Sequence, residues 1–119
     1  MPNSIITRTG SYIPTLRIPN KHFLDHEFYG SDGKKLEKAN EDIINKLQKI
    51  TGIKERRYVT DDLNASDLAF LAANQALDGI NKEKLEYIII AQNLGDVRAD
   101  NIRTDMIPTI ASRVKQKIW

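Results

Sequence analysis

The feature that most constrains this chain is an uninterrupted apolar run from Tyr87 to Ala91, inside residues 85–92. Apolar and polar residues do not alternate along it, so a strand built from it would need cover on both faces. This pattern is typical of a strand in a parallel sheet with helices above and below. The run therefore predicts an α/β protein, in which neighbouring strands pair the backbone groups of this one.

Few such neighbours are predicted within the chain. Residues 4–13 hold several β-branched and aromatic residues and end at Pro14, which predicts one strand. Gly10 within it predicts a bulge or a close backbone approach. Residues 54–60 are expected to form a charged edge strand. Three strands leave such a sheet incomplete, so we expect the chain to be part of a longer protein or to complete its sheet with a partner.

Two helices are predicted before the apolar run. Residues 34–50 carry one apolar stripe at helical spacing. Ser31 or Asp32 is expected to cap the start of this helix, and Gly52 to end it in a left-handed conformation. A shorter helix is predicted over residues 22–28.

Two more helices are predicted around the apolar run. Residues 67–78 are rich in alanine and follow Ser66, a favourable cap, while Gly79 is expected to end the helix. Residues 93–105 are expected to form a polar loop, and Pro108 then fits the first turn of a final helix. The apolar face of that helix is predicted to contain Ile107, Ile110, Ala111, Val114 and Ile118.

Composition excludes several classes of protein. The 119 residues suit one domain, and a net charge of 18 − 16 = +2 argues against a nucleic-acid partner. No apolar run approaches the roughly 18 residues that span a membrane, and no signal peptide is visible at the start, so a cytoplasmic location is expected. The sequence has no cysteine, which excludes disulfides, thiolate metal sites and a cysteine nucleophile within these residues.

Several short motifs occur in an informative order: Thr9 to Pro14, Thr51-Gly52-Ile53-Lys54-Glu55-Arg56-Arg57, Ser66 to Ala69, and the proline-led helix at Pro108. Together they resemble the amino-terminal part of the β-ketoacyl-acyl-carrier-protein synthase III family, which are condensing enzymes of the thiolase fold. The Thr-Gly-Ile motif is the most specific of these pieces. The resemblance covers essentially the whole chain, but about the first third of a family member.

The resemblance implies that residues 1–119 are the N-terminal segment of a thiolase-like domain, with an incomplete mixed or parallel sheet and covering helices. It implies a parent acyltransferase, in the biosynthesis of fatty acids or related products, that condenses an acyl thioester with malonyl-acyl-carrier protein. The catalytic cysteine, histidine and asparagine of the family would lie beyond Trp119, so this chain alone is expected to be inactive. A homodimer and an acyl-carrier-protein partner are implied, and no cofactor.

The resemblance also marks candidate site residues. Ile107 stands where family members place a residue that reaches across the dimer into the acyl pocket; the alternative is an ordinary core residue. Lys46 and Ile50 stand where housekeeping members hold coenzyme A with a tryptophan and an arginine. Their identity here favours a carrier-protein thioester or a specialised substrate.

Three other polar groups have two interpretations each. Lys54, Arg56 and Arg57 are candidates for binding the phosphate of a carrier-protein arm, or for an ion-pair network with Glu55, Asp61 and Asp62. His22 and His26 have the spacing of a metal pair, but no third ligand is evident, so a polar surface helix is preferred and no metal is predicted. The loop at residues 93–101 is either a ligand loop at a strand end or a solvated segment.

Two alternatives to the condensing enzyme remain open at the level of sequence. One is a non-catalytic interaction domain that dimerises to complete its sheet. The other is a different thiolase-fold enzyme, such as a polyketide-type or hydroxymethylglutaryl-type synthase.

Overall fold

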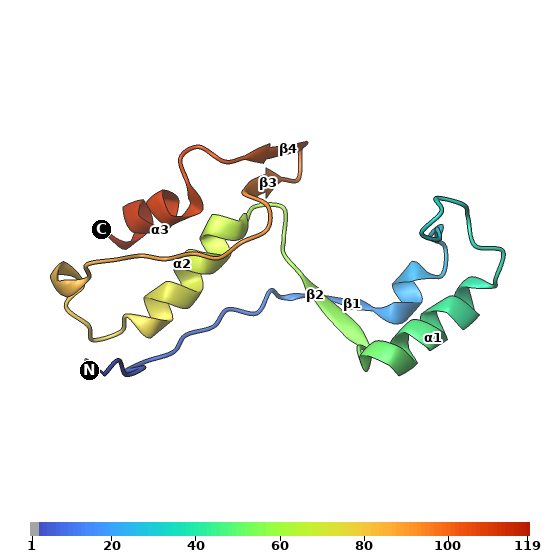
Figure 1. Cartoon of the computed structure of the whole chain (residues 1–119), viewed down its shortest axis with the longest axis horizontal. Coiled ribbons are helices and arrows are strands. Elements are labelled where there is room, and N and C mark those ends of the chain that lie inside the picture. Colours follow the sequence, from blue (N-terminus) through green and yellow to red (C-terminus); the bar gives the residue numbers. More distant parts are fainter. Residues whose placement is uncertain (1–2) are drawn as a thin grey trace. The chain divides into compact units, whose positions relative to one another are not determined.

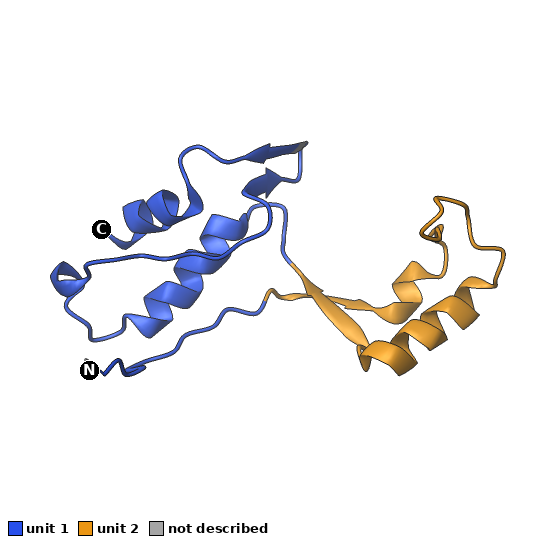
Figure 2. Ribbon diagram, viewed as in Figure 1, with its two compact units in different colours: residues 1–13, 59–119 blue, residues 14–58 orange. Residues whose placement is uncertain are grey.

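The computed structural model describes residues 3–119, which form two compact units (Figures 1 and 2). Among the described residues, unit 1 contains residues 3–13 and 59–119, and unit 2 contains residues 14–58. Each unit is described by itself below. None of the helices in the described part of the chain is long and apolar enough to cross a membrane.

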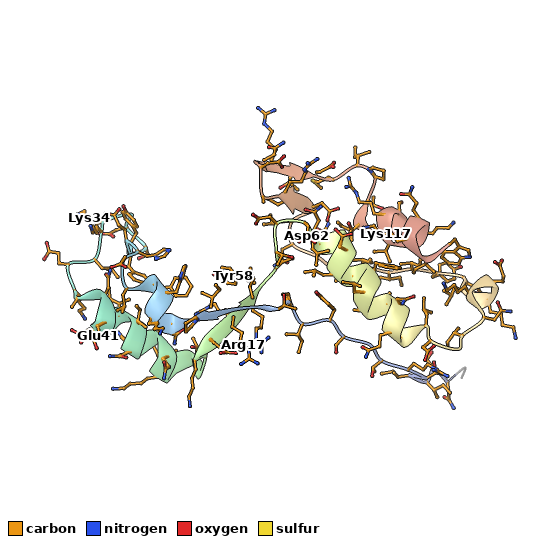
Figure 3. All side chains as sticks on the ribbon, turned by 180° about the vertical axis from the view of Figure 1, so that it is seen from behind. Arg17, Lys34, Glu41, Tyr58, Asp62 and Lys117 are labelled. Carbon is orange, nitrogen blue, oxygen red and sulfur yellow. The ribbon has the colours of Figure 1, made fainter. Side chains whose placement is uncertain are left out.

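Unit 2 contains a short antiparallel ladder. Strand β1 (Leu16–Pro19) pairs with strand β2 (Glu55–Tyr58), in a register that sets Arg17 opposite Arg57. Two like charges facing each other across a ladder are unfavourable. Glu55 relieves this repulsion, because its carboxylate lies 3.3 Å from Nε of Arg57 and 3.9 Å from Nε of Arg17. The side chains of Arg17 and Tyr58 extend from this ribbon (Figure 3).

Helix α1 (Asn40–Thr51) provides the core of unit 2. It follows the 3₁₀ helix η1 (Asn20–Phe23) in the chain and packs against it. Ile43 and Ile44 are buried, and Gly52 ends the helix with a φ of 70°. This ending confirms the predicted left-handed residue. The predicted start is wrong: the helix begins six residues later than residue 34, after Ala39 rather than after Ser31 or Asp32.

Helix α2 (Ala65–Ala76) begins with a capping box in unit 1. Asn64 and Asp67 exchange side-chain and backbone hydrogen bonds, so the cap is Asn64 and not Ser66 as predicted. Burial would raise the pKa of Asp67, but hydrogen bonds from Lys117 and from the backbone of Asn64 bring that pKa below its ordinary value. The Lys117 contact also joins α2 to helix α3 (Ile110–Ile118).

The core of unit 1 lies between α2 and α3. Ile110, Val114 and Ile118 are buried at helical spacing, as predicted, and Val114 is 1% exposed. Partly buried side chains of α2 and of the segment that follows it pack against them: Ala69, Phe70, Ala73, Leu77, Ile88 and Ile90. Helix α2 ends at Ala76 with Leu77 as its cap, so Gly79 is not the predicted cap; its left-handed φ of 68° lies in the turn that follows.

Residues 3–13 form an irregular extended segment that runs beside α2 (Figure 1), and they do not form the predicted strand. A Cβ placed on Gly10 would overlap the backbone oxygen of Ala72, so the predicted close backbone approach is confirmed. The backbone N–H of Ser11 donates to the side chain of Gln75 at 2.7 Å, and Arg8 donates to the backbone oxygen of Asp78.

A hairpin replaces the polar loop predicted over residues 93–105. Strand β3 (Asp96–Arg98) pairs with strand β4 (Asn101–Asp105), with Asp96 directly opposite Asp105. Gly95 permits the close approach of the two strands, because a Cβ there would lie 2.5 Å from the backbone oxygen of Asp105.

The strand predicted over residues 85–92 is not formed in this chain. Apart from one isolated bridge, the described residues hold two ladders, both two-stranded and antiparallel, so the predicted parallel sheet is not formed either. The segment instead runs beside α2 and α3 without ladder partners (Figure 1). Ile88 and Ile90 pack on the helical core, whereas Tyr87 and Ile89 are 82% and 92% exposed.

The short helix predicted over residues 22–28 is a 3₁₀ turn in the structure, η1, which ends at Phe23. The backbone carbonyls of Leu24 and His26 accept hydrogen bonds from the side chain of Asn40 instead. Side-chain amides therefore organise the region that the prediction assigned to helical backbone bonds.

Candidate functional site

The loop before α3 presents Ile107 to solvent. This side chain is 86% exposed, and its neighbour Met106 is 65% exposed. In the described structure Ile107 therefore lies outside α3 and outside the buried cluster of unit 1. The helix proper begins after Thr109, whose side-chain oxygen accepts a hydrogen bond from the backbone N–H of Ser112.

Arg113, on the first turns of α3, is bonded to this loop. Its Nε donates to the carbonyl of Pro108 at 2.9 Å, and its Nη2 donates to the carbonyl of Ile107 at 3.2 Å. The planar guanidinium can bind several acceptors at once because its donors have a fixed fork geometry. Arg113 thus binds the backbone carbonyls of two consecutive loop residues, Ile107 and Pro108.

A buried aspartate lies beneath Arg113. Asp96 is 2% exposed and accepts hydrogen bonds from the N–H of Ser66 at 2.8 Å, from Oγ of Ser66 at 2.7 Å and from Nη1 of Arg113 at 3.1 Å. Asp105 lies opposite Asp96 in the hairpin and contacts Nη2 of Arg113 at 2.8 Å. The arginine therefore neutralises two facing carboxylates.

The contact between Arg113 and Asp105 shifts the pKa of both side chains. A hydrogen bond from Arg113 holds the pKa of Asp105 below its ordinary value of 3.8, and the same bond raises the pKa of Arg113. A carboxyl group whose pKa is lowered on folding adds stability above its unfolded pKa, and that stability is lost as the pH falls through the folded pKa.

We therefore expect acid to weaken unit 1, and Asp105→Asn to reduce that effect. The urea midpoint of the wild-type chain should fall between pH 7 and about pH 3, and the fall should be smaller in the variant, since its side chain does not titrate. The single tryptophan, Trp119, belongs to unit 1, so its fluorescence follows this transition. Asp100→Asn is the control, because Asp100 pairs with Arg98 instead. Equal pH dependence in all three proteins would contradict the expectation.

Sequence reasoning missed the contacts among Ser66, Asp96 and Arg113. It treated Ser66 as a helix cap and Asp96 as part of a loop, and it gave Arg113 no role. Ser66 and Asp96 are 30 residues apart, so no local spacing indicates their contact. One signal was present in the sequence: Asp96 directly follows Gly95, and a glycine beside an aspartate marks a turn.

In unit 2, Arg56 forms one side of a small apolar cavity. Its Nη1 donates to Oδ1 of Asn20 at 3.1 Å, and its guanidinium lies 5.5 Å from the ring centre of Phe23. The Asn20 amide donates in turn to Gln48 at 2.9 Å and to the carbonyl of Ile53 at 2.8 Å. The cavity has a volume of about 210 Å³, and Phe28, Ile44 and Leu47 add to its lining.

Arg57 has different partners from its neighbour Arg56. It pairs with Glu55 and lies 3.4 Å from the carbonyl of Pro14. The predicted ion-pair network is therefore confirmed for Glu55 and Arg57 and extends to Arg17. Asp61 and Asp62 belong to unit 1, so their part in it stays a prediction.

Lys46 and Ile50 lie one turn apart on α1, beside an open surface that Ile43 and Leu47 also line. Ile50 is 70% exposed. Neither residue is brought to the Arg56 cavity. The structure therefore divides the four candidates for the substrate arm among three places within unit 2: Lys46 and Ile50 on α1, Arg56 at the cavity, and Arg57 at its pair with Glu55.

His22 and His26 lie close together, with ring centres 5.3 Å apart, and both contact the ring of Phe23. In residues 3–119, no group of three or more histidine, cysteine, aspartate or glutamate side chains could hold a metal ion. The metal-pair interpretation gains no third ligand from the fold.

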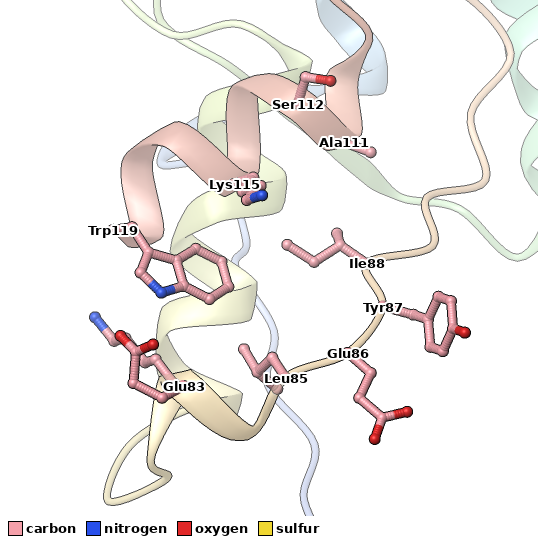
Figure 4. A pocket seen from close by; sticks show the side chains of 10 residues that line it. Glu83, Leu85, Glu86, Tyr87, Ile88, Ala111, Ser112, Lys115 and Trp119 are labelled. Atoms are coloured by element: carbon pink, nitrogen blue, oxygen red, sulfur yellow. The ribbon is translucent and has the colours of Figure 1, made fainter.

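A cleft of about 500 Å³ lies between α3 and residues 82–88 (Figure 4). Leu85, Ile88 and the indole of Trp119 line it, together with the polar side chains of Ser112 and Lys115. The ammonium group of Lys115 lies 5.9 Å from the ring centre of Trp119. The cleft borders the face of residues 85–92 that the helices cover.

Sequence comparison finds curated relatives of this chain. Proteins called β-ketoacyl-acyl-carrier-protein synthase III from three strains of Staphylococcus aureus, Newman, JH1 and Mu3, are each 35% identical to this chain over 74 residues. The match covers 60% of this chain and 21% of each relative, so the chain spans about a fifth of the length of the curated relatives it matches. No family model matches the chain. The resemblance to part of β-ketoacyl-acyl-carrier-protein synthase III, which the motifs predict, is thus confirmed by sequence similarity over 60% of the chain.

Proposed function

We propose that this chain is the N-terminal segment of a condensing enzyme of the β-ketoacyl-acyl-carrier-protein synthase III type, with a thiolase-like fold. The sequence similarity supports this proposal, since it is shared with proteins of that name over 60% of the chain. The family motif at Thr51-Gly52-Ile53 also supports it, because Gly52 has the left-handed conformation that favours glycine.

The observation that carries the proposal is the half-covered segment at residues 85–92. Ile88 and Ile90 are packed on the helices, while Tyr87 and Ile89 are exposed and the segment has no ladder partner in the described structure. Exposing large apolar side chains and unpaired backbone groups together is unfavourable. Further strands and a second helical layer, supplied by the rest of a thiolase-like domain, would satisfy both.

The proposed reaction is a decarboxylative condensation. An acyl group is held as a thioester on a cysteine, malonyl-acyl-carrier protein loses CO₂, and the resulting carbanion attacks the acyl carbonyl, which releases the thiolate. These 119 residues contain no cysteine, so the nucleophile would come from outside this sequence. The segment alone is then inactive: it would support the nucleophile, shape the acyl pocket and form part of a homodimer interface in a cytoplasmic enzyme.

The donor is proposed to be a carrier-protein thioester. Lys46 and Ile50 offer no aromatic surface on which an adenine could stack and no guanidinium for its phosphates. Arg56 is already engaged by Asn20 and Phe23, and Arg57 by Glu55. These positions therefore favour protein-mediated delivery over tight binding of free coenzyme A.

The test is made on the product of the whole reading frame that encodes this chain. The purified protein is incubated with malonyl-acyl-carrier protein and a series of acyl thioesters, on carrier protein or on coenzyme A, and the 3-oxoacyl product is measured by mass spectrometry. Formation of that product with loss of CO₂ supports the proposal. Absence of acyl transfer with every donor would overturn it. A condensation of another type would indicate a different thiolase-fold enzyme.

The same exposed segment favours one second candidate, a non-catalytic domain that dimerises through residues 85–92. Sedimentation of the 119-residue chain tests it, together with Ile89→Lys, which places a charge on the exposed face. A dimer that Ile89→Lys dissociates, from a reading frame without condensing activity, would establish this candidate in place of the enzyme.

We expect Ile107→Ala in the whole protein to admit longer acyl groups. An exposed apolar tip that enters the acyl pocket of a partner subunit would limit the length of the chain, and a few methylene groups are worth roughly tenfold or more in selectivity. The ratio of kcat/KM for long and short acyl thioesters measures the change. Met106→Ala is the control, because it shortens an exposed side chain in the same loop. An unchanged ratio in Ile107→Ala would remove Ile107 from the pocket.

A further inference from the structure

We propose that Arg113 is a positioning residue, which fixes the Ile107 loop against the Ser66–Asp96 pair and so sets the acyl-chain selectivity of the enzyme. The selectivity part of this inference rests on the proposed function. The positioning part concerns the chain itself and stands on the contacts within unit 1.

Arg113 makes an unusually complete set of hydrogen bonds. All three guanidinium nitrogens are used: Nε on the carbonyl of Pro108, Nη1 on Asp96 at 3.1 Å, and Nη2 on both the Ile107 carbonyl and Asp105. Such a set defines the position of the group, because a rigid planar fork satisfies several acceptors only in one orientation. The loop carbonyls are thereby fixed relative to the two aspartates.

Asp96 anchors this arrangement to helix α2. Asp96 is 2% exposed, and both of its oxygens accept bonds from Ser66, in the first turn of α2. The carboxylate is therefore held by α2 independently of its contact with Arg113. The chain of contacts runs from α2 through Asp96 and Arg113 to the backbone at Ile107.

The loop presents an apolar side chain on a bonded backbone. Its backbone is bonded inward through two carbonyls, while the Ile107 side chain is 86% exposed. A large apolar side chain on a fixed backbone offers a surface of defined position, which loses less conformational entropy on binding than a mobile one. This is the property required of a residue that limits the depth of a pocket.

The first experiment tests positioning without any activity. Hydrogen exchange is measured on the peptide covering residues 105–110 of the 119-residue chain, in the wild type, Arg113→Lys and Arg113→Met. Lysine keeps the charge but cannot bond two carbonyls and two carboxylates together. We expect exchange in this peptide to rise by about tenfold or more in both variants. Arg98→Lys and Arg98→Met are the controls, because Arg98 bonds Asp100 on the exposed hairpin.

Exchange in residues 105–110 that matches the Arg98 controls would overturn the positioning role. A general rise across α2 and α3 in Arg113→Lys would also overturn it, because it would show a role in overall stability and not in the loop. The hydrogen-exchange experiment tests the positioning role whether or not the parent protein is a condensing enzyme.

The second experiment tests selectivity in the whole protein with a double-mutant cycle. Arg113→Lys is expected to change the ratio of kcat/KM for long and short acyl thioesters by several-fold, and to have no further effect when Ile107→Ala is present. A merely structural role would lower activity on all donors equally and would add to Ile107→Ala. If the wild type condenses and Arg113→Lys leaves the ratio unchanged, the selectivity inference fails; if the wild type does not condense, the proposed function fails instead.

Discussion

Replacing Asp96 with alanine is expected to destabilise unit 1 by about 3 kcal/mol or more. The carboxylate is 2% exposed and accepts two bonds from Ser66 and one from Arg113. Its removal leaves the buried N–H of Ser66 without this acceptor and leaves Arg113 partly buried without one of its two carboxylates. Urea unfolding followed by the fluorescence of Trp119 measures the loss.

Two further variants identify the cause. Asp96→Asn keeps the shape and one carbonyl acceptor but loses the charge, so it should cost less than alanine. In an Arg113→Met background, Asp96→Ala should cost less than it does alone, because the pair is already broken. Asp100→Ala removes an exposed carboxylate from the same hairpin and should change stability by less than about 0.5 kcal/mol. A cost for Asp96→Ala no larger than that of Asp100→Ala would contradict the network.

The parts of the fold that sequence predicts well are those set by neighbours along the chain. Ile110, Val114 and Ile118 recur at helical spacing and are buried together. Gly52 ends α1 through its backbone freedom, and Gly79 has a positive φ in the turn after α2. In each case the signal and the structure lie within a few residues of each other.

The strand predicted at residues 54–60 forms as β2, paired with β1, but the strands predicted at residues 85–92 and 4–13 fail for the opposite reason. A strand requires partners, and residues 85–92 have the composition of a buried strand without a partner in the described structure. Residues 4–13 likewise run along α2 and pair with no strand there. The hairpin of β3 and β4 was missed because its residues are polar, and the close approach at Gly95 joins groups ten residues apart.

The candidate site divides in the same way. Ile107 is exposed in the loop before α3, and the acyl-pocket role that the resemblance implies for it stays a prediction. Arg56 and Arg57 are neighbours in sequence, but alternation along a strand gives them different partners, Asn20 and Glu55. Pairing of this kind is decided by three-dimensional contacts, which a list of charged residues does not reveal.

Replacing Gly10 with valine is expected to release residues 4–13 from α2 and to destabilise unit 1 by about 3 kcal/mol. A Cβ at this position would overlap the backbone oxygen of Ala72 and lie 2.6 Å from the backbone nitrogen of Ala76. Backbone atoms inside a helix cannot move aside without breaking its hydrogen bonds, so the segment must leave instead. The hydrogen bond between Ser11 and Gln75 would be lost with it.

Hydrogen exchange in residues 4–13 and the urea midpoint of unit 1 measure this release. The informative control is Ala76→Gly in the Gly10→Val background. It removes the Ala76 Cβ, which lies 3.1 Å from the new Cβ, but leaves both backbone contacts in place. We therefore expect no rescue beyond the usual cost of glycine in a helix. Recovery of wild-type stability in the double variant would show that side-chain crowding, and not the backbone of α2, requires glycine here.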